Sequence, residues 1–388
     1  MDKLIGLALI VIPFISIKTQ DIRELKGALA FVIMMVLGLL AIYSGKIKPF
    51  KNKWALVLVG FVWINIMLSP SSGLKFAGME LMQFWSWKPL CYLIAYLLGI
   101  IAIASDDRIN VRFILKTMVW VGFIMSCFTI LQSCWLDQFF GATGAIHEQW
   151  NIGGTLGHPT FVGSFVAMII PLAFYLRKKS MAYVMIATVL ITQSQVAIGA
   201  MIIGLSLYFA CKGRKQLIGV IVCLIAISIG TAYLAYNKPG YITSSGRFNE
   251  WKRIIDDVKS PIRAGEEFGK YPITGRGLGS FYYTYHVIHS KVNQPCRLFQ
   301  AHNEYLEWLY NCGIVGLVLL LLAIAHIYKK NFLKNEYRTA LLSSFTCIAV
   351  CAGGLYVWQL GATMYFTAVI VGLLHSEVED GYNSVNNI

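Results

Sequence analysis

Apolar residues in this chain form long uninterrupted blocks rather than an alternating pattern. Blocks of about 16–22 apolar residues are typical of helices that cross a hydrocarbon core of roughly 30 Å. The blocks predict membrane spans near residues 4–17, 27–43, 54–69, 89–104, 113–134, 159–176, 181–193, 196–210, 216–236, 312–328, 338–356 and 360–375. The pattern therefore predicts an all-α polytopic membrane protein with about 12 transmembrane helices.

The pair 181–193 and 196–210 leaves an alternative open, because both blocks are short and one long broken helix would also fit. Charge favours two separate spans. With twelve spans and a cytoplasmic N-terminus, the inside loops hold most of the lysines and arginines of the short loops, as the positive-inside rule requires. A merged pair would place the basic segments 177–179 and 212–215 on opposite sides. This arrangement predicts that both termini are cytoplasmic.

The first block resembles a signal sequence in its charge and apolar run. It contains Pro13 and no small-residue cleavage site, and a second apolar block follows at once. We expect an uncleaved first span.

Composition agrees with a membrane protein. The 388 residues are 57% hydrophobic and 13% charged, with a mean hydropathy of +0.63. Residues 1–388 are therefore predicted to form a single membrane domain rather than several soluble ones. The net charge of +14 is explained largely by basic loops against an anionic leaflet, so no nucleic-acid partner is expected.

The polar segment 237–311 lies between the ninth and tenth predicted spans, on the outer side. It contains apolar residues at positions i, i+3, i+4 and i+7, the spacing of one helical face. These residues are Trp251, Ile254, Ile255 and Val258. The spacing predicts a short amphipathic helix that lies along the membrane surface or covers the bundle.

A glycine cluster follows in the same segment, where Gly275, Gly277 and Gly279 surround Arg276. Such a cluster makes a tight turn whose backbone amides suit an anion. On its own, an ordinary loop turn is the favoured interpretation. No Gly-Lys-Ser/Thr follows, which excludes a nucleotide-hydrolase phosphate loop.

His302 and Asn303 are predicted at the start of a helix that continues into the tenth span. A helix N-terminus directs a partial positive charge at whatever His302 faces. From these residues alone, a half-exposed loop histidine is slightly favoured.

Taken together and in order, these motifs resemble the conserved loop region of the O-antigen ligase family, which includes O-antigen ligases, O-antigen polymerases and protein O-oligosaccharyltransferases. The motifs are Ser245-Gly246-Arg247, then the run 275–281, then His302-Asn303-Glu304-Tyr305-Leu306 before Gly313-Ile314-Val315-Gly316. Residues 154–160, which open the sixth span, are similar to the family's glycine-rich motif. The resemblance covers about residues 150–330.

The resemblance implies a bacterial inner-membrane enzyme that moves a glycan from a polyprenyl-diphosphate lipid to an acceptor hydroxyl. Segment 237–311 would then be its periplasmic catalytic loop. By this resemblance Arg247 and Arg276 stabilise the departing diphosphate, since a guanidinium binds phosphate oxygens bidentately. His302 takes or orients the acceptor proton, or hydrogen-bonds to the diphosphate.

The resemblance also implies substrate-binding residues, a donor and an acceptor. The expected binding residues are Gly275, Gly277, Gly279, Asn303, Gln195 and His158. The expected partners are a polyprenyl-diphosphate-linked glycan, an acceptor that is a glycan, lipid A-core or protein, and membrane lipids. No cofactor or metal is expected, because His286-x-x-His289 lacks an evident third ligand.

The chain departs from the family at three positions. Gln195 stands where members commonly have arginine, Asn311 stands at an often acidic position, and Thr160 replaces the usual asparagine. These departures leave a non-catalytic relative as one alternative.

Within the family, the sequence does not separate ligase, polymerase and protein transferase. A transporter or lipid flippase, which belongs to a different class, would need a continuous polar path through the spans. The available polar residues are scattered over different predicted helices: Asn65, Gln132, Gln193, Gln195 and Gln359. The predicted spans contain no Asp or Glu, unlike those of most ion-coupled carriers.

Overall fold

A computed structural model of the protein describes residues 1–15, 22–68, 81–134, 153–213, 247–259, 271–281, 300–332 and 334–378. These ranges contain helices and no strand. The first part comprises α1 (Asp2–Phe14), α2 (Ile22–Tyr43), α3 (Lys53–Leu68), α4 (Leu81–Ser105), α5 (Val111–Cys134), η2 (Gly154–Leu156), α6 (Pro159–Ala167), α7 (Ile170–Tyr175), α8 (Lys179–Ile191) and α9 (Gln195–Ala210). The second part comprises α11 (Arg247–Lys259), α12 (Tyr271–Thr274), α14 (Glu304–Asn331), α15 (Glu336–Ala352), η6 (Val357–Gln359) and α16 (Gly361–His375).

Most predicted spans coincide with one helix. The span predicted at 216–236 lies outside the described residues. The span predicted at 159–176 is instead two short helices, α6 and α7, with a break at 168–169. Pro171 follows the break and explains it, because proline lacks the amide hydrogen that an uninterrupted helix needs.

The segments 181–193 and 196–210, which could also have formed one broken helix, are two separate helices, α8 and α9. The chain turns at residues 192–194, where Gln193 has a φ of 50°, and the Ser194 side chain caps α9 by accepting from the Ala197 amide. The end of α9 contacts the start of α15, since the Tyr208 hydroxyl lies 2.8 Å from a Glu336 carboxylate oxygen. The start of α8 follows Tyr175, whose ring packs 5.9 Å from the Tyr337 ring. The two helices therefore run out and back.

Length and composition mark this as a membrane protein. Three helical segments are long and apolar enough to cross a membrane, at Leu25–Tyr43, Val111–Ser133 and Glu304–Asn331. Shorter apolar helices surround them, at Lys53–Asn65, Pro89–Ser105, Pro159–Tyr175, Lys179–Ile191, Gln195–Ala210 and Gly361–His375. The predicted total of twelve spans remains a prediction.

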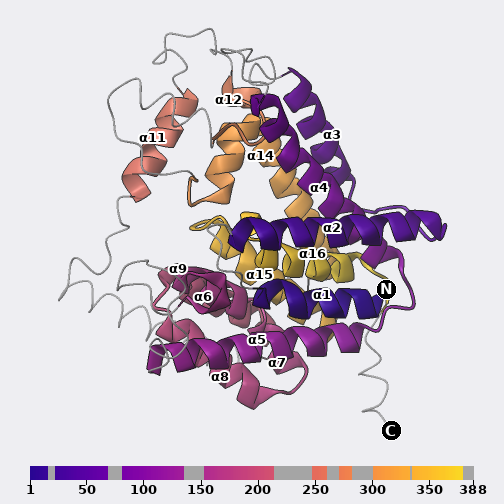
Figure 1. The fold of residues 1–388 in the computed structure, drawn as a ribbon, viewed down its shortest axis with the longest axis vertical. Coiled ribbons are helices and arrows are strands. Elements are labelled where there is room, and N and C mark those ends of the chain that lie inside the picture. Colours follow the sequence, from indigo (N-terminus) through magenta and orange to yellow (C-terminus); the bar gives the residue numbers. More distant parts are fainter. Residues whose placement is uncertain are drawn as a thin grey trace.

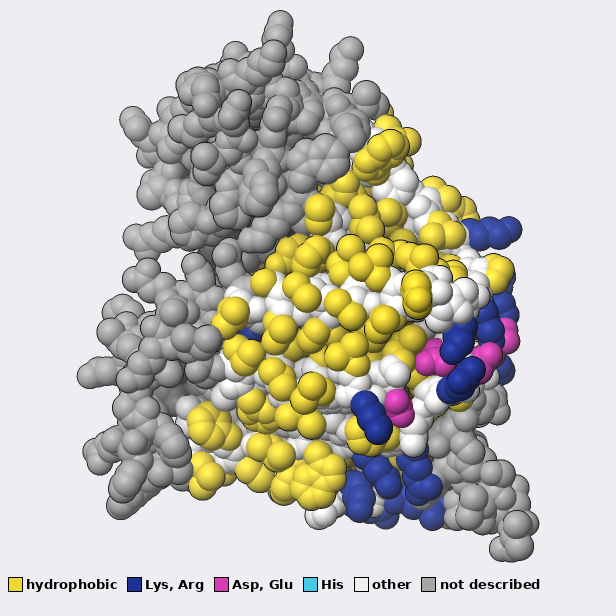
Figure 2. Space-filling model, turned by 45° about the vertical axis from the view of Figure 1, so that its right-hand side comes forward, with side chains coloured by type: hydrophobic (Ala, Val, Ile, Leu, Met, Phe, Trp, Pro, Cys, Tyr) yellow, Lys and Arg dark blue, Asp and Glu magenta, His cyan; other side chains and the backbone are white. Residues whose placement is uncertain are grey.

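The helices α1, α2, α5 and α16 run side by side through the middle of the bundle (Figure 1). Their outer surfaces expose large apolar side chains, among them Leu39 of α2 and Trp120 of α5. Apolar side chains spread across much of the described face in Figure 2. An apolar belt over fully hydrogen-bonded helices is the surface that lipid tails require.

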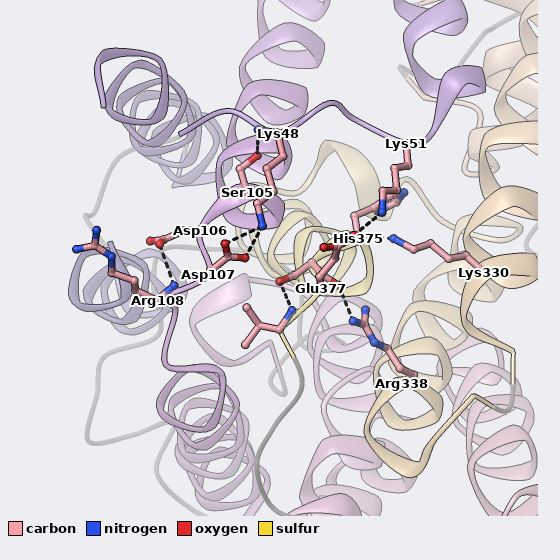
Figure 3. A network of polar contacts seen from close by, with 12 residues as sticks. Lys48, Lys51, Ser105, Asp106, Asp107, Arg108, Lys330, Arg338, His375 and Glu377 are labelled. Atoms are coloured by element: carbon pink, nitrogen blue, oxygen red, sulfur yellow. Dashed lines mark hydrogen bonds and ion pairs between the residues drawn. The ribbon is translucent and has the colours of Figure 1, made fainter. Parts of the chain in front are cut away.

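Charged residues gather at one end of the bundle, which we call the basic end (Figure 2). It comprises Lys48, Lys51, Asp107, Lys330, Arg338 and Glu377, which come from the connections and helix ends (Figure 3). The Lys48 ammonium lies 2.6 Å from an Asp107 carboxylate oxygen. Lys51 pairs with Glu377 and holds the pKa of that carboxyl below its usual range.

Arg338 is buried at this end, with 2% of its surface exposed. Its guanidinium donates to the carbonyls of Leu373 and Leu374 at 2.9 and 2.8 Å. A cation at the last carbonyls of a helix stabilises that helix, so Arg338 caps α16.

Helix α14 changes direction inside its length, at Gly313, whose φ of 64° and ψ of −170° are not helical. The span predicted at 312–328 therefore begins at this kink. The stretch before the kink packs with α11 and α12 at the top of Figure 1. The predicted amphipathic helix is confirmed as α11, and its Ile254 is fully buried in a cluster with Phe281, Ala301 and Tyr310.

Candidate functional site

His302 sits immediately before α14 in a strained backbone conformation, with a φ of 49°. Its neighbours hold it there. Asn303 caps α14, because its side-chain oxygen accepts from the Leu306 amide at 3.2 Å. The Ala301 carbonyl accepts from the Trp251 indole at 2.9 Å, and the Ala301 amide donates to Glu307 at 3.3 Å. The prediction that His302 and Asn303 open this helix is confirmed.

Two acidic residues, Glu304 and Glu307, lie in the first turns of α14, before the stretch 312–328 that was predicted to span the membrane. The buried Glu304 carboxylate accepts from the Trp358 amide at 3.0 Å and from the Gln359 side chain at 3.4 Å. The same Gln359 side chain donates to Glu307 at 2.9 Å. These contacts join the start of α14, directly after His302, to η6.

A chain of aromatic contacts links His302 to His158. The His302 ring lies 5.0 Å from the Tyr356 ring, Tyr356 lies 5.4 Å from Phe161, and Phe161 lies 4.9 Å from His158. The two histidines therefore flank the same pair of aromatic rings, although they are far apart in sequence.

His158 caps α6, since its Nδ1 accepts from the Thr160 amide at 3.1 Å. The turn before it depends on glycine, because Gly154 and Gly157 have φ values of 53° and 79°. Gln132 supports the turn by accepting from the Gly154 amide at 2.8 Å. Thr160, a departure from the family, thus contributes its amide rather than its side chain to this cap.

Arg276 is half-buried, and its guanidinium lies over the Tyr310 ring, 4.4 Å from the ring centroid. One guanidinium nitrogen lies 3.4 Å from the Asp257 carbonyl oxygen of α11. Tyr310 belongs to the cluster that includes Ala301, the residue before His302. Arg276 and His302 therefore border one buried cluster.

The turn at residues 275–279 packs against the kink of α14. Its Arg276 and Gly277 backbone amides bind carbonyls of α14 and are therefore not free to bind an anion. The Arg276 amide donates to the Tyr310 carbonyl at 3.3 Å, and the Gly277 amide donates to the Asn311 carbonyl at 2.8 Å. A Cβ on Gly275 would lie 2.3 Å from the Asn311 carbonyl oxygen. Such close backbone contact gives a physical reason for glycine here, and the role of Gly275, Gly277 and Gly279 toward substrate stays a prediction.

Asn311 fastens the same turn. It is 4% exposed, and its side-chain oxygen accepts from the Ser280 hydroxyl at 3.0 Å and the Phe281 amide at 2.8 Å. An amide oxygen thus serves as the acceptor at a position that is often acidic in the family.

Arg247 is the first residue of α11, one turn before Trp251. Its side chain lies outside the described residues. The indole contact between Trp251 and Ala301 places this first turn beside the segment that carries His302, and the contact between Asp257 and Arg276 places the far end of α11 beside Arg276. Helix α11 therefore extends from the segment that carries His302 to Arg276.

Gln195 is the first residue of α9 and is exposed. The next residue, Val196, packs against Gly354, since a Cβ there would lie 2.7 Å from a Val196 methyl group. Gln195 thus lies beside the turn that leads to Tyr356, on the same side of the bundle as His302.

The sequence pattern assigns no role to Lys26 or Glu304. The predicted span begins at residue 27 and leaves Lys26 just outside it, yet Lys26 lies inside α2 and is 3% exposed. Its position beside Gly27, at the edge of an apolar block, was the available signal. Glu304 is part of a motif, and its spacing of three residues from Glu307 places both carboxylates on one helical face.

The fold and these contacts define a helical membrane protein whose His158, His302 and Arg276 lie away from its basic end. Residues 180–321 match the family model described as O-antigen ligase, and this match supports the resemblance that the motifs indicated. Arg247, Arg276, His302 and Gln195 fall inside the match, and His158 falls before it. The match supports a function of the O-antigen ligase or polymerase type. No curated protein shows a significant match to the chain.

Proposed function

We propose that this protein transfers a glycan from a polyprenyl-diphosphate lipid to an acceptor hydroxyl at the outer face of the bacterial inner membrane. The acceptor oxygen forms a bond to the anomeric carbon, the bond from that carbon to the phosphate oxygen breaks, and the lipid diphosphate leaves with the electron pair. The hydroxyl proton passes to His302. The family match carries the reaction class, and the contacts around His302 and Arg276 support the assignment of roles.

Negative charge on the leaving diphosphate is the main barrier, so fixed cations lower it most. The guanidinium of Arg276 is held between Tyr310 and the Asp257 carbonyl, which supports a preorganised charge. In our proposal Arg247 supplies a second guanidinium from the first turn of α11. Gln195 takes the place of a third and contributes hydrogen bonds without charge.

His302 suits proton transfer because a neutral imidazole accepts a proton near working pH. Its strained φ of 49° supports this role, since strain at a fixed side chain is typical of functional sites. His158, on the other side of the Tyr356 and Phe161 rings, is proposed to hold the sugar portion of the substrate.

A transporter function is less well supported. Three of the five polar residues that could line a transport path instead contact neighbouring groups. Asn65 donates to the Thr274 carbonyl, and Gln132 accepts from the Gly154 amide. Gln359 donates to the Glu307 carboxylate. Side chains committed to such contacts make poor linings for a solvated path.

Reconstitution tests the proposal. The purified protein is mixed with polyprenyl-diphosphate glycan and, separately, with lipid A-core, free glycan or a pilin-like peptide, and both the product and the released lipid diphosphate are measured. The acceptor that gives product decides between ligase, polymerase and protein transferase. If no acceptor yields product and no lipid diphosphate is released, the proposal is overturned.

His302→Ala and Arg276→Ala should each lower turnover by about tenfold or more while the protein still folds. Lys252→Ala is the matched control, because Lys252 is an exposed cation of α11 outside the contacts described above. Full turnover in both site variants would show that the roles are assigned wrongly.

A further inference from the structure

Two carboxylates follow His302 closely in the first turns of α14. Glu304 is 3% exposed, and Glu307 is partly buried. Neither forms an ion pair with a cation in the described part of the chain. Buried charges are normally paired, because the removal of an ion from water is costly. The reaction proposed above uses neither carboxylate.

One side chain brings the two carboxylates together. The Gln359 amide nitrogen donates to a Glu304 oxygen at 3.4 Å and to a Glu307 oxygen at 2.9 Å. The Gln359 amide oxygen accepts from the Gln300 side chain at 3.1 Å, which fixes the direction of the amide. Both carboxylates therefore lie close to the same nitrogen, and η6, which carries Gln359, contains no charged residue.

Two negative charges at such short range repel each other. A like charge nearby and burial both favour the protonated form of a carboxyl group. The groups that donate to this pair are neutral amides, and the adjacent Tyr305 hydroxyl donates to the Ala349 carbonyl instead. The protons of two carboxyl groups that interact in this way belong to the pair rather than to either residue. One proton between the two groups would remove the repulsion.

The same two carboxylates hold His302 from both sides. Glu307 accepts from the amide of the residue before His302 at 3.3 Å. Glu304 accepts from the Trp358 amide at 3.0 Å, within the short helix η6 that begins directly after Tyr356. The Tyr356 ring lies 5.0 Å from the His302 ring. The carboxylates therefore fix both the backbone that carries the imidazole and the ring that the imidazole contacts.

The backbone of His302 needs such support. Its φ of 49° is strained, and strain of this kind persists only where the surrounding structure imposes it. Acidic residues in the first turn of a helix also interact favourably with the helix dipole. That purely structural role does not explain the pair, because Asn303 already caps α14 and the hydrogen bonds of Glu304 lead out of α14 to η6.

We propose that Glu304 and Glu307 share one proton and act together as the positioning residues of His302. The positioning role rests on the function proposed above, in which His302 accepts the proton of the acceptor hydroxyl. The shared proton allows two carboxylates to occupy one contact without a counter-ion. The contact in turn holds the imidazole in a single orientation.

Infrared difference spectra test the shared proton without any substrate. A protonated carboxyl group has a carbonyl band that an ionised carboxylate lacks. At neutral pH, the difference between full-length wild type and the double variant Glu304→Gln, Glu307→Gln in nanodiscs should contain this band. Glu377→Gln is the matched control, because Glu377 is exposed at the basic end and pairs with Lys51, so its difference spectrum should lack the band. Absence of the band from the first difference would overturn the proposal.

Turnover tests the positioning role. Glu304→Leu removes the acceptor of the Trp358 amide, whereas Glu304→Gln keeps an oxygen for it. We expect Glu304→Leu to lower kcat by about tenfold or more with little change in KM for the lipid donor, and Glu304→Gln to restore most of kcat. Glu377→Gln should match wild type. Wild-type kcat in a folded Glu304→Leu, or a raised KM with unchanged kcat, would overturn the positioning role.

Gln359→Met decides the outcome if Glu304→Leu does not fold. Gln359 is exposed, and this change removes the donor that the carboxylates share. It should lower kcat several-fold at an unchanged melting temperature, and it should shift the imidazole nitrogen resonances of His302 in protein with isotope-labelled histidine, assigned with His302→Ala. Unchanged resonances would overturn the proposal. Shifted resonances in a protein that transfers no glycan would refute the reaction and leave the positioning of His302 standing.

Discussion

At the scale of single residues, the departures from the family have different physical meanings. Asn311 is buried and fills a structural role, because one oxygen accepts two hydrogen bonds from the glycine turn. Gln195, by contrast, is exposed at the start of α9. A substitution at the first position should therefore act on stability, and one at the second should act on catalysis.

Asn311→Leu should destabilise the protein by about 1–3 kcal/mol, since the Ser280 hydroxyl and Phe281 amide lose their acceptor. Asn311→Asp keeps an acceptor oxygen and should lose less. Thermal unfolding of the detergent-purified variants measures the difference. Equal melting temperatures for Asn311→Leu and wild type would contradict this role.

Gln195→Arg should preserve or raise glycan transfer, because it restores a cation at the exposed start of α9. The initial rate of transfer from polyprenyl-diphosphate glycan is the measurement. Complete inactivation would mean that the site has been rebuilt around the amide of Gln195.

At the scale of elements, α14 and the glycine turn form one unit. The turn donates to carbonyls of Tyr310 and Asn311, next to the residue at which α14 departs from helical geometry. The kink at Gly313 is therefore the place where Arg276 is fixed to the bundle.

Gly313→Ala should destabilise the protein by about 1–3 kcal/mol from its positive φ alone, and by more from a Cβ only 2.3 Å from the Ile273 carbonyl oxygen. Gly60→Ala is the matched control, because a Cβ there meets nothing within 4 Å. Melting temperatures of the two variants should separate clearly. A neutral Gly313→Ala would argue against the kink.

Much of this element structure could be predicted from sequence. Apolar blocks and the spacing of Trp251, Ile254 and Val258 correctly predicted helices, because burial of an apolar face depends on local periodicity. The kink, the burial of Lys26 and the Glu304 contacts were not predictable, since each depends on a partner distant in sequence. The glycine cluster stands out in the sequence, but a sequence does not reveal which carbonyls its amides will meet.

At the scale of the whole molecule, the two ends of the bundle differ in chemistry. Ion pairs such as Lys48 with Asp107 occupy the basic end, while His302 and His158 share the aromatic rings of Tyr356 and Phe161. The segments that the charge pattern predicts inside meet at the basic end, which supports the predicted alternation of the helices.

Single cysteines test this orientation in a variant whose nine native cysteines are replaced. Lys252→Cys and Lys46→Cys are matched, because both lysines are exposed. A membrane-impermeant maleimide should label position 252 in intact spheroplasts and position 46 only after permeabilisation. The same labelling pattern at both positions would contradict the predicted topology.

The shortness of the helices has a consequence for the surrounding lipid. At 1.5 Å per residue, the 13 residues of α8 extend about 20 Å, against a hydrocarbon thickness of roughly 30 Å. Such hydrophobic mismatch is relieved when the bilayer thins locally. Local thinning of the bilayer beside α6–α9 would bring the headgroup plane closer to His158. A carrier lipid could then present its sugar without leaving its leaflet. Short-chain phospholipids should therefore support faster turnover than long-chain ones.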